Sequence, residues 1–174
     1  MAGAEIKVRA FIDANVLFAG IAFPRRPYEV LQHAAAGDFR LVLSPLVINQ
    51  ARRSLQKNFP EYIDRFEAFI ESVDYELVSD PTLDEVEANK NIIRDFSDVP
   101  VALSAISAKA EYIVSEDKDF TTQDATTAAL RGHLKIMLSG TFLREVMGWT
   151  SEQLESIRHR KWSDITEKES HVQE

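Results

Sequence analysis

Two short apolar runs that lie far apart in the chain both end in acidic residues. The first, residues 6–12, is followed by Asp13. The second, residues 112–114, leads into a segment that contains Asp117 and Asp119. Both runs are rich in β-branched and aromatic residues and short enough to be buried strands. If they lie parallel in one sheet, the aspartates converge at its carboxyl edge, where open α/β sheets bind ligands. Because clustered carboxylates repel one another, such an edge favours a bound cation.

The composition excludes several classes of protein. With 174 residues the chain is long enough for one domain with a substantial core. The absence of cysteine excludes disulfide bonds and thiolate metal sites. No apolar stretch approaches the roughly 20 residues that span a bilayer, and the first residues lack the features of a secretion signal. We therefore expect a cytoplasmic protein that does not enter a membrane.

The formal net charge of −8 gives no sign of a general nucleic-acid-binding surface. It does not exclude a nucleic-acid enzyme, because local basic residues can hold phosphates while a metal ion binds the carboxylates. Four arginines near the acidic motifs are candidate phosphate contacts, and the alternative is that they are ordinary solvated charges. They are Arg25, Arg26, Arg52 and Arg53.

Strand-like and helix-like segments alternate along the chain, which predicts βαβ units and a mainly parallel sheet. The expected strands are residues 6–12, 39–43, 75–78, 112–114 and 134–137. The expected helices are residues 27–36, 45–57, 61–72, 82–93, 98–110, 141–147 and 150–160, with residues 18–26 as a loop or short helical turn. Residues 158–162 are basic and aromatic, and we expect them to form a solvated helix end, with a contact to RNA or a partner as the alternative. Beyond Trp162 the chain is polar, and we expect it to be frayed.

Four segments in chain order resemble the PIN-domain family of metal-dependent ribonucleases. They are residues 11–17 (FIDANVL), 43–50 (LSPLVINQ), 98–102 (DVPVA) and 114–120 (VSEDKDF). The resemblance implies a three-layer α/β/α fold with a five-stranded, mostly parallel sheet over residues 1–149. Residues 150–174 would then form a C-terminal helix and a polar tail.

The resemblance also implies a Mg²⁺ or Mn²⁺ site at the carboxyl edge of the sheet. Hard carboxylate oxygens suit these ions, which can activate a water for attack on a phosphodiester. By the family's pattern Asp13, Asp98 and Asp117 are the primary acids, with Asp119 alongside. Asn15 would hold the first turn or bind a water, and Ser115 would donate a hydrogen bond to a phosphate or a carboxylate.

Gln50 departs from the family's pattern, which places a glutamate at this position. Residues 45–60 contain no aspartate or glutamate, so no shift of register supplies the missing acid. An amide oxygen can still face a water or a metal ion, but it brings no negative charge and cannot act as a base. Weaker metal binding and slower chemistry are therefore expected.

Each aspartate also has an ordinary structural interpretation. Asp13 followed by Asn15 can form a turn in which side chains bond to the backbone. Asp98 stands before a predicted helix, where an aspartate commonly caps the first turn. Asp117 and Asp119 can belong to a solvated turn. The order of all the motifs along the chain favours the metal site over these alternatives.

The leading interpretation is an endoribonuclease of PIN type, as the toxin of a toxin–antitoxin pair, with RNA as its substrate, an antitoxin as a partner and a homodimer by analogy. The first alternative is a PIN-like RNA-binding or protein-interaction module whose catalysis is impaired at Gln50. The second is a phosphatase of the haloacid-dehalogenase type. That chemistry needs an aspartate two residues after the first, where this chain has Asn15. A receiver-type signalling domain fits least, because no lysine follows the last predicted strand in the required place.

Overall fold

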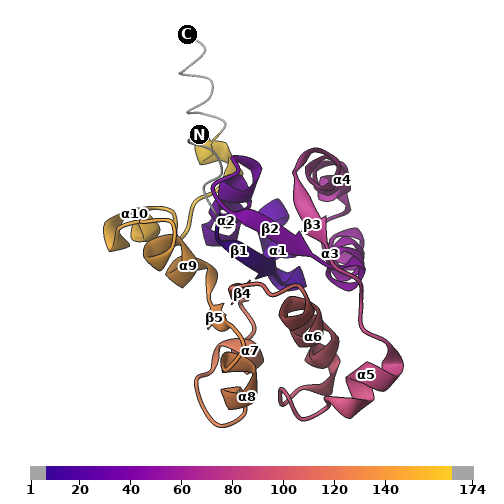
Figure 1. The fold of residues 1–174 in the computed structure, drawn as a ribbon. Helices are drawn as coiled ribbons and strands as arrows, with labels where there is room; N and C mark the ends of the chain where they lie inside the picture. The colour runs from indigo at the N-terminus through magenta and orange to yellow at the C-terminus, as the bar shows by residue number, and fades with distance from the viewer. Residues whose placement is uncertain (1–6, 166–174) are drawn as a thin grey trace, which may run out of the picture.

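The chain forms a five-stranded sheet with helices on both sides (Figure 1). The computed structural model describes residues 7–165, apart from the side chain of Asp119. All neighbouring strands are parallel, in the order β3-β2-β1-β4-β5. The strands are β1 (Arg9–Ile12), β2 (Arg40–Leu43), β3 (Tyr75–Leu77), β4 (Tyr112–Val114) and β5 (Lys135–Met137). The three-layer α/β/α fold expected from the sequence is confirmed, and the sheet is parallel throughout.

The helices fill the connections between successive strands. Between β1 and β3 the chain forms α1 (Ala14–Ala22), α2 (Arg26–Ala35), α3 (Pro45–Asn58), η1 (Pro60–Tyr62) and α4 (Ile63–Ser72). Between β3 and β5 it forms α5 (Leu83–Ala88), η2 (Phe96–Asp98), α6 (Val99–Ser107), α7 (Lys118–Thr121) and α8 (Ala128–Arg131). It continues with α9 (Ser139–Glu145) and α10 (Ser151–Ser156). Among the described residues, no helix is long and apolar enough to cross a membrane.

The strand order places a topological switch point between β1 and β4. From β1 the chain moves outward to β2 and β3, and it then returns past β1 to β4 and β5 on the other side. Right-handed crossovers in opposite directions put the two sets of helices on opposite faces. Accordingly, α6, α7 and α8 lie on the other side of the sheet from α2 and α4 in Figure 1. Ligands of open α/β sheets bind at such a point, outside the carboxyl ends of the strands.

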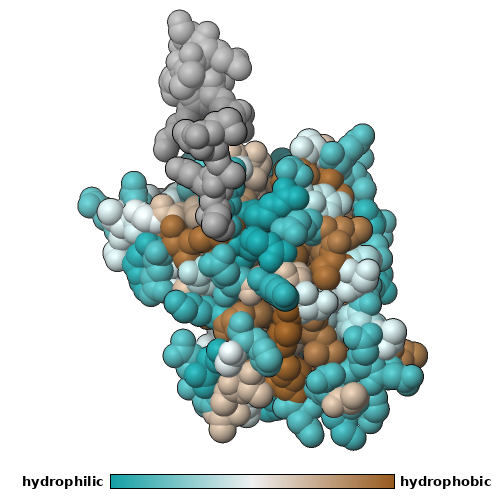
Figure 2. All heavy atoms as spheres, in the orientation of Figure 1, coloured by the Kyte–Doolittle hydropathy of each residue, from teal (hydrophilic) through white to brown (hydrophobic). Residues whose placement is uncertain are grey.

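The central strands are buried on both faces, as parallel sheets usually are. Ala10, Phe11 and Ile12 of β1 have no exposed surface, and the same holds for Ile113 and Val114 of β4. Helices from both layers pack onto these residues in one continuous core. Figure 2 shows hydrophilic residues over most of the face in view, with an apolar band near its middle.

Helix α1 is longer than the loop or short helical turn expected over residues 18–26, because it already begins at Ala14 and continues to Ala22. The side chain of Asp13 accepts a hydrogen bond from the Ala14 N–H and begins the helix. The helix is apolar and largely buried, so it lacks the alternation of polar and apolar residues that reveals a surface helix. Gly20 permits its packing on α2, because a Cβ there would lie 2.5 Å from Leu31 Cδ1.

Three further helices are shorter than expected. The capping box of Thr82 and Glu85 is present, but α5 ends at Ala88 and does not continue to residue 93. Helix α6 ends at Ser107 because the chain turns at Lys109, which has a φ of 56°. The capping box of Thr150 and Gln153 begins α10 as expected, but the helix ends at Ser156 and does not continue to residue 160.

The segment after α10 is docked on the body of the protein, which corrects the expectation of a solvated end. The Trp162 indole donates to the carbonyl of Ala22 at 2.9 Å, and the Arg160 guanidinium pairs with Glu29 at 2.9 Å. Arg65 of α4 lies over the Trp162 ring, 4.1 Å from its centroid. Residues 166–174 lie outside the described part of the chain, and the expected division at residue 149 stays a prediction.

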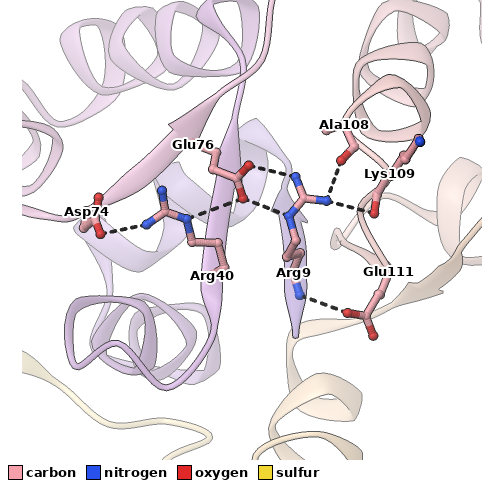
Figure 3. Close-up of polar contacts among 7 residues, drawn as sticks. All are labelled: Arg9, Arg40, Asp74, Glu76, Ala108, Lys109 and Glu111. Atoms are coloured by element: carbon pink, nitrogen blue, oxygen red, sulfur yellow. Dashed lines mark hydrogen bonds and ion pairs between the residues drawn. The ribbon is translucent and has the colours of Figure 1, made fainter. Parts of the chain in front are cut away.

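A network of charged side chains joins the amino-terminal ends of three strands (Figure 3). Glu76 of β3 accepts hydrogen bonds from Arg9 of β1 at 2.8 and 2.9 Å, and it pairs with Arg40 of β2 at 3.4 Å. Arg9 also donates to the carbonyl of Lys109 at 3.0 Å, and Arg40 pairs with Asp74 at 2.7 Å. The hydrogen bond from Arg9 is the main reason why the pKa of Glu76 lies below its ordinary value.

We expect Glu76→Gln to lower the free energy of unfolding at pH 7 by about 1 kcal/mol, because it leaves two neighbouring guanidinium groups without their shared carboxylate. The effect is modest because the side chain of Glu76 is 35% exposed. Because the pKa of Glu76 is lower in the folded state, its carboxylate stabilises the fold at pH values above the unfolded pKa. This stabilisation is lost as the pH falls through the folded-state pKa. Urea unfolding at pH 7 and pH 3 should show a smaller loss at pH 3 than at pH 7, and Glu71→Gln should have little effect at either pH.

Candidate active site

An open cavity of about 510 Å³ lies at the carboxyl edge of the sheet, beside the ends of β1 and β4. Asp13, Asp98 and Asp117, which the sequence predicts as the primary acids, all line it. They come from three separate segments of the chain: the end of β1, the start of α6 and the turn after β4. The other residues that line it are Ala14, Asn15, Phe18, Gln50, Arg53, Ser54 and Asn58.

Asp13 is a buried carboxylate with an unusual environment. Its side chain is only 6% exposed, and it accepts hydrogen bonds from the Ala14 N–H and the Ser115 hydroxyl, each at 2.8 Å. Burial raises the pKa of Asp13 above its ordinary value, and the negative charge of Asp117 raises it further. The hydrogen bonds oppose this shift. A cation in the cavity would offset both the burial and the repulsion.

Ser115 connects the two acidic strand ends. Its hydroxyl is fully buried, donates to Asp13 Oδ2 and accepts a hydrogen bond from the Asp117 N–H at 3.0 Å. This one side chain therefore holds the end of β1 against the turn that carries Asp117. The Ser115 hydroxyl thereby orients the side chain of Asp13 and the backbone of Asp117.

Asn15 holds the first turn of α1 against the segment after β4. Its amide nitrogen lies 3.3 Å from both Asp13 Oδ2 and Ser115 Oγ, and its Oδ1 accepts from the Glu116 N–H at 3.1 Å. The side chain of Glu116 is exposed and accepts a hydrogen bond from the Ser139 N–H at 3.0 Å. It thereby caps the first turn of α9.

Asp98 occupies the position before α6, yet its side chain forms no capping hydrogen bond with that helix. The side chain instead lines the cavity that Asp13 and Asp117 share. Its placement therefore differs from that of an ordinary helix-capping aspartate. It brings an acid from the second helical layer to the edge of the sheet.

The four candidate phosphate-binding arginines have different environments. Arg53 lines the acidic cavity. Arg52 is bound to Glu67, with Nε 2.6 Å from Oε1. Arg25 donates to the carbonyl of Arg160 at 3.2 Å, and Arg26 lies in a separate cavity beside Gly140. That all four contact RNA stays a prediction, and only Arg53 lies beside the aspartates.

A family model described as the PIN domain matches residues 9–119. This span is more than half of the 174-residue chain, and it contains every predicted acid of the site. The chain belongs to the PIN domain family. A search of curated proteins finds no significant match.

Two solved structures are similar to this PIN domain. The structure of PAE2754 from Pyrobaculum aerophilum has a TM-score of 0.59 and 18% identity, and the match covers 84% of this chain and 100% of that one. At this identity the likeness concerns the fold. The structure of VapBC2 from Rickettsia felis bound to a DNA fragment from their promoter has a TM-score of 0.49 and 15% identity, with 75% and 98% covered.

The donor atoms of this PIN domain fit a hard divalent cation in kind. The cavity offers carboxylate oxygens from Asp13, Asp98 and Asp117 and amide groups from Asn15 and Gln50, and such oxygens are ligands of Mg²⁺ and Mn²⁺. Within residues 7–165, no three acidic or histidine side chains stand close enough to hold one ion as they are. The side chain of Asp119 lies outside the described residues, so its place in the site stays a prediction.

Sequence reasoning missed Phe18, Ser54 and Asn58. The sequence predicts a loop or short helical turn at Phe18, so it does not place this residue on the same helix as Asn15. The signal for the other two was present, because Gln50, Ser54 and Asn58 recur at intervals of four on one predicted helix and so share a face. Extending the Gln50 face along that helix would have found them.

We expect Asp13→Asn to raise the free energy of unfolding of the metal-free PIN domain at pH 7 by about 1 kcal/mol, because it removes a buried charge but keeps the shape of the side chain. Asp13 has a raised folded-state pKa. Its contribution to stability is therefore present below the unfolded pKa and is lost as the pH rises through the folded value.

Denaturant unfolding in a chelator between pH 3 and pH 8 measures this effect. The gain in Asp13→Asn should grow as the pH rises, and Asp64→Asn on the exposed side of α4 should show no such trend. A variant that is less stable than the wild type at pH 7 would contradict the assigned cost of the buried carboxylate.

Proposed function

We propose that this chain is a metal-dependent endoribonuclease of PIN type that hydrolyses RNA phosphodiesters. The observation that carries the proposal is the cavity at the switch point, which Asp13, Asp98 and Asp117 line together with Arg53. Carboxylates alone would repel a phosphodiester, and an arginine alone would bind one without reaction. Acids that can hold a cation, together with a guanidinium group in one cavity, suit phosphate chemistry.

The acids would hold Mg²⁺ or Mn²⁺, with Asp13, Asp98 and Asp117 as primary ligands and Asp119 alongside. Such an ion supplies Lewis acidity, which polarises the phosphodiester, stabilises the leaving oxygen and favours deprotonation of a water. The donor set supports this assignment, since it offers oxygen and no sulfur.

The chain itself supplies orientation and charge. Ser115 and Asn15 fix Asp13 through hydrogen bonds, so the carboxylate needs little rearrangement when substrate arrives. Burial of Asp13 excludes water from one side of the site and strengthens its interaction with a cation. Arg53 would bind a phosphate oxygen and align the strand.

Gln50 supports one alternative, a PIN domain that binds RNA or a protein partner with impaired catalysis. Its side chain lines the same cavity as the aspartates and brings no charge to it. The haloacid-dehalogenase alternative has no support, because Asn15 is engaged with Glu116 and the chain belongs to the PIN family.

The proposal also concerns the biological role. The nuclease would act as the toxin of a toxin–antitoxin pair, and it would be neutralised by an antitoxin protein. It would work in the cytoplasm as a homodimer. Co-expression with the product of the neighbouring reading frame tests the toxin role and its neutralisation. Survival of cells that express both proteins, and arrest of cells that express this chain alone, is the expected result.

Titration with Mn²⁺ tests the metal site without relying on activity. The melting temperature of the wild type should rise with Mn²⁺, because binding to the folded state alone stabilises it. Asp13→Asn should lose this response, while Asp64→Asn should keep it. A wild type that is indifferent to Mn²⁺ would contradict the metal-dependent function.

Cleavage of RNA in Mn²⁺ tests the mechanism. We expect Asp117→Asn to reduce the rate by about 100-fold or more, because it removes a charged ligand at the reacting phosphate. Gln50→Glu should raise the rate roughly 10-fold by adding a carboxylate at the cavity wall. The control is Gln56→Glu, on the exposed side of the same helix. Equal rates for the wild type and Asp117→Asn would exclude a catalytic role for this aspartate.

A further inference from the structure

The end of α2 carries a histidine whose two ring nitrogens both have partners. Gly37 follows the helix with a φ of 78°, so the backbone N–H of Asp38 turns back to the carbonyl of His33 at 2.9 Å. This turn brings the two side chains together, with His33 Nδ1 2.7 Å from Asp38 Oδ2. On the other side of the ring, the indole N–H of Trp149 donates to His33 Nε2 at 2.9 Å. The ring therefore joins α2 to the connection between α9 and α10.

These partners fix the protonation state of His33. An indole nitrogen is only a donor, so Nε2 must accept with its lone pair. An ionised carboxylate is only an acceptor, so the ring proton lies on Nδ1 and points at Asp38. The bond to Trp149 therefore exists only while the imidazole is neutral. A second proton would turn Nε2 into a donor that faces another donor, whereas the contact with Asp38 would remain as an ion pair.

Water can reach the ring of His33. The side chain is 22% exposed, and it lines an open cavity of about 530 Å³ beside α2 and the start of α10. Imidazole groups change charge between about pH 8 and pH 5, so an accessible ring gains a proton under mild conditions. Asp38 and the carbonyl end of α2, whose last turn contains His33, both attract the positive charge that results.

The other charged groups near the ring do not oppose this charge. Glu29, one turn before His33 on α2, lines the same cavity and is bound to Arg160 at 2.9 Å. Lys7, before β1, is bound to a backbone carbonyl in the turn after α2. On the side of α10 the cavity is lined by the uncharged Gln153. Among the described residues that line the cavity there is no lysine or arginine.

Trp149 stands at the junction of two helices. Its backbone N–H bonds to the carbonyl of Leu143 in α9 at 2.9 Å, and the next residue, Thr150, caps the first turn of α10. The position of the indole is therefore coupled to the start of α10. The bond to His33 ties this junction to α2, while Leu154 packs α10 into the core. Loss of the bond would loosen the junction and leave the rest of the core in place.

We propose that His33 is a pH-sensitive latch between α2 and the junction of α9 and α10. In its neutral form the ring accepts the indole N–H and holds the junction against α2. When a proton from solvent binds Nε2, the hydrogen bond to Trp149 breaks, Asp38 keeps the imidazolium in place, and α10 loosens from α2. The latch lies outside the acidic cavity, so it does not depend on the proposed nuclease function.

The indole N–H signals of the two tryptophans test the latch within one protein. Trp162 donates its indole N–H to the carbonyl of Ala22, which does not titrate, so its signal is the internal control. In NMR spectra of the full chain, the Trp149 signal should move toward the position of a free indole as the pH falls from 8 to 5.5. The Trp162 signal should stay in place, which also shows that the protein remains folded. A Trp149 signal that does not respond to pH overturns the proposal.

Variants at His33 assign the response to this ring. His33→Gln offers an amide oxygen that can accept from the indole but has no charge to gain, so the Trp149 signal should stay at its bonded position at both pH values. His33→Leu should give the free position at both. His133→Gln removes an exposed histidine after α8 and should respond as the wild type does. A pH response that persists in His33→Gln would show that another group titrates.

Hydrogen exchange of the backbone amides of α10 tests whether the junction loosens. Comparison of the wild type with His33→Gln at the same pH cancels the pH dependence of the exchange chemistry itself. We expect equal rates at pH 8 and roughly 5-fold faster exchange in the wild type at pH 5.5, because one hydrogen bond has been lost. The amides of α6, on the other face of the sheet, should exchange equally in both proteins. Equal exchange of α10 at pH 5.5 would show that the bond to Trp149 holds no helix in place, and the latch would be wrong.

Discussion

The hydrogen bond from the buried Ser115 hydroxyl to Asp13 is the interaction on which the candidate site depends. It joins two strand ends that are neighbours in the sheet but lie on opposite halves of the chain. The parallel order of the strands brings the two ends together, and the hydroxyl then fixes their relative orientation. Asn15, the turn that carries Asp117 and the start of α9 are all positioned from this point through further hydrogen bonds.

The site keeps a carboxylate where the fold alone would disfavour one. Burial and the charge of Asp117 both raise the pKa of Asp13, while Ser115, Ala14 and Asn15 lower it. The opposing contributions leave an acid that is well oriented and poorly solvated, which is an unfavourable state for stability and a favourable one for binding a cation. Gln50 lines the same cavity and adds no further negative charge to it.

The acids could be predicted because each follows a recognisable strand or precedes a helix, and parallel strands carry their ends to one edge. For this reason Asp13, Asp98 and Asp117 line the same cavity. Helix α1 could not be predicted, since burial on nearly all sides removes the periodic pattern that marks a helix. The difference between Arg52 and Arg53 was also hidden, because it depends on Glu67 from another helix. Local sequence places the acids, but tertiary contacts decide which cations remain available to a substrate.

Because Arg160 and Trp162 dock at the end of α1, the support of this helix depends on residues that are synthesised late. Their partners are the carbonyls of Pro24 and Ala22, at the end of the helix that carries Asn15 and Phe18. These contacts come from residues that follow every strand of the sheet in the chain. During translation the sheet can therefore assemble while the end of α1 still lacks its last neighbours. The helix that forms one wall of the acidic cavity acquires its final support only when the residues after α10 have left the ribosome.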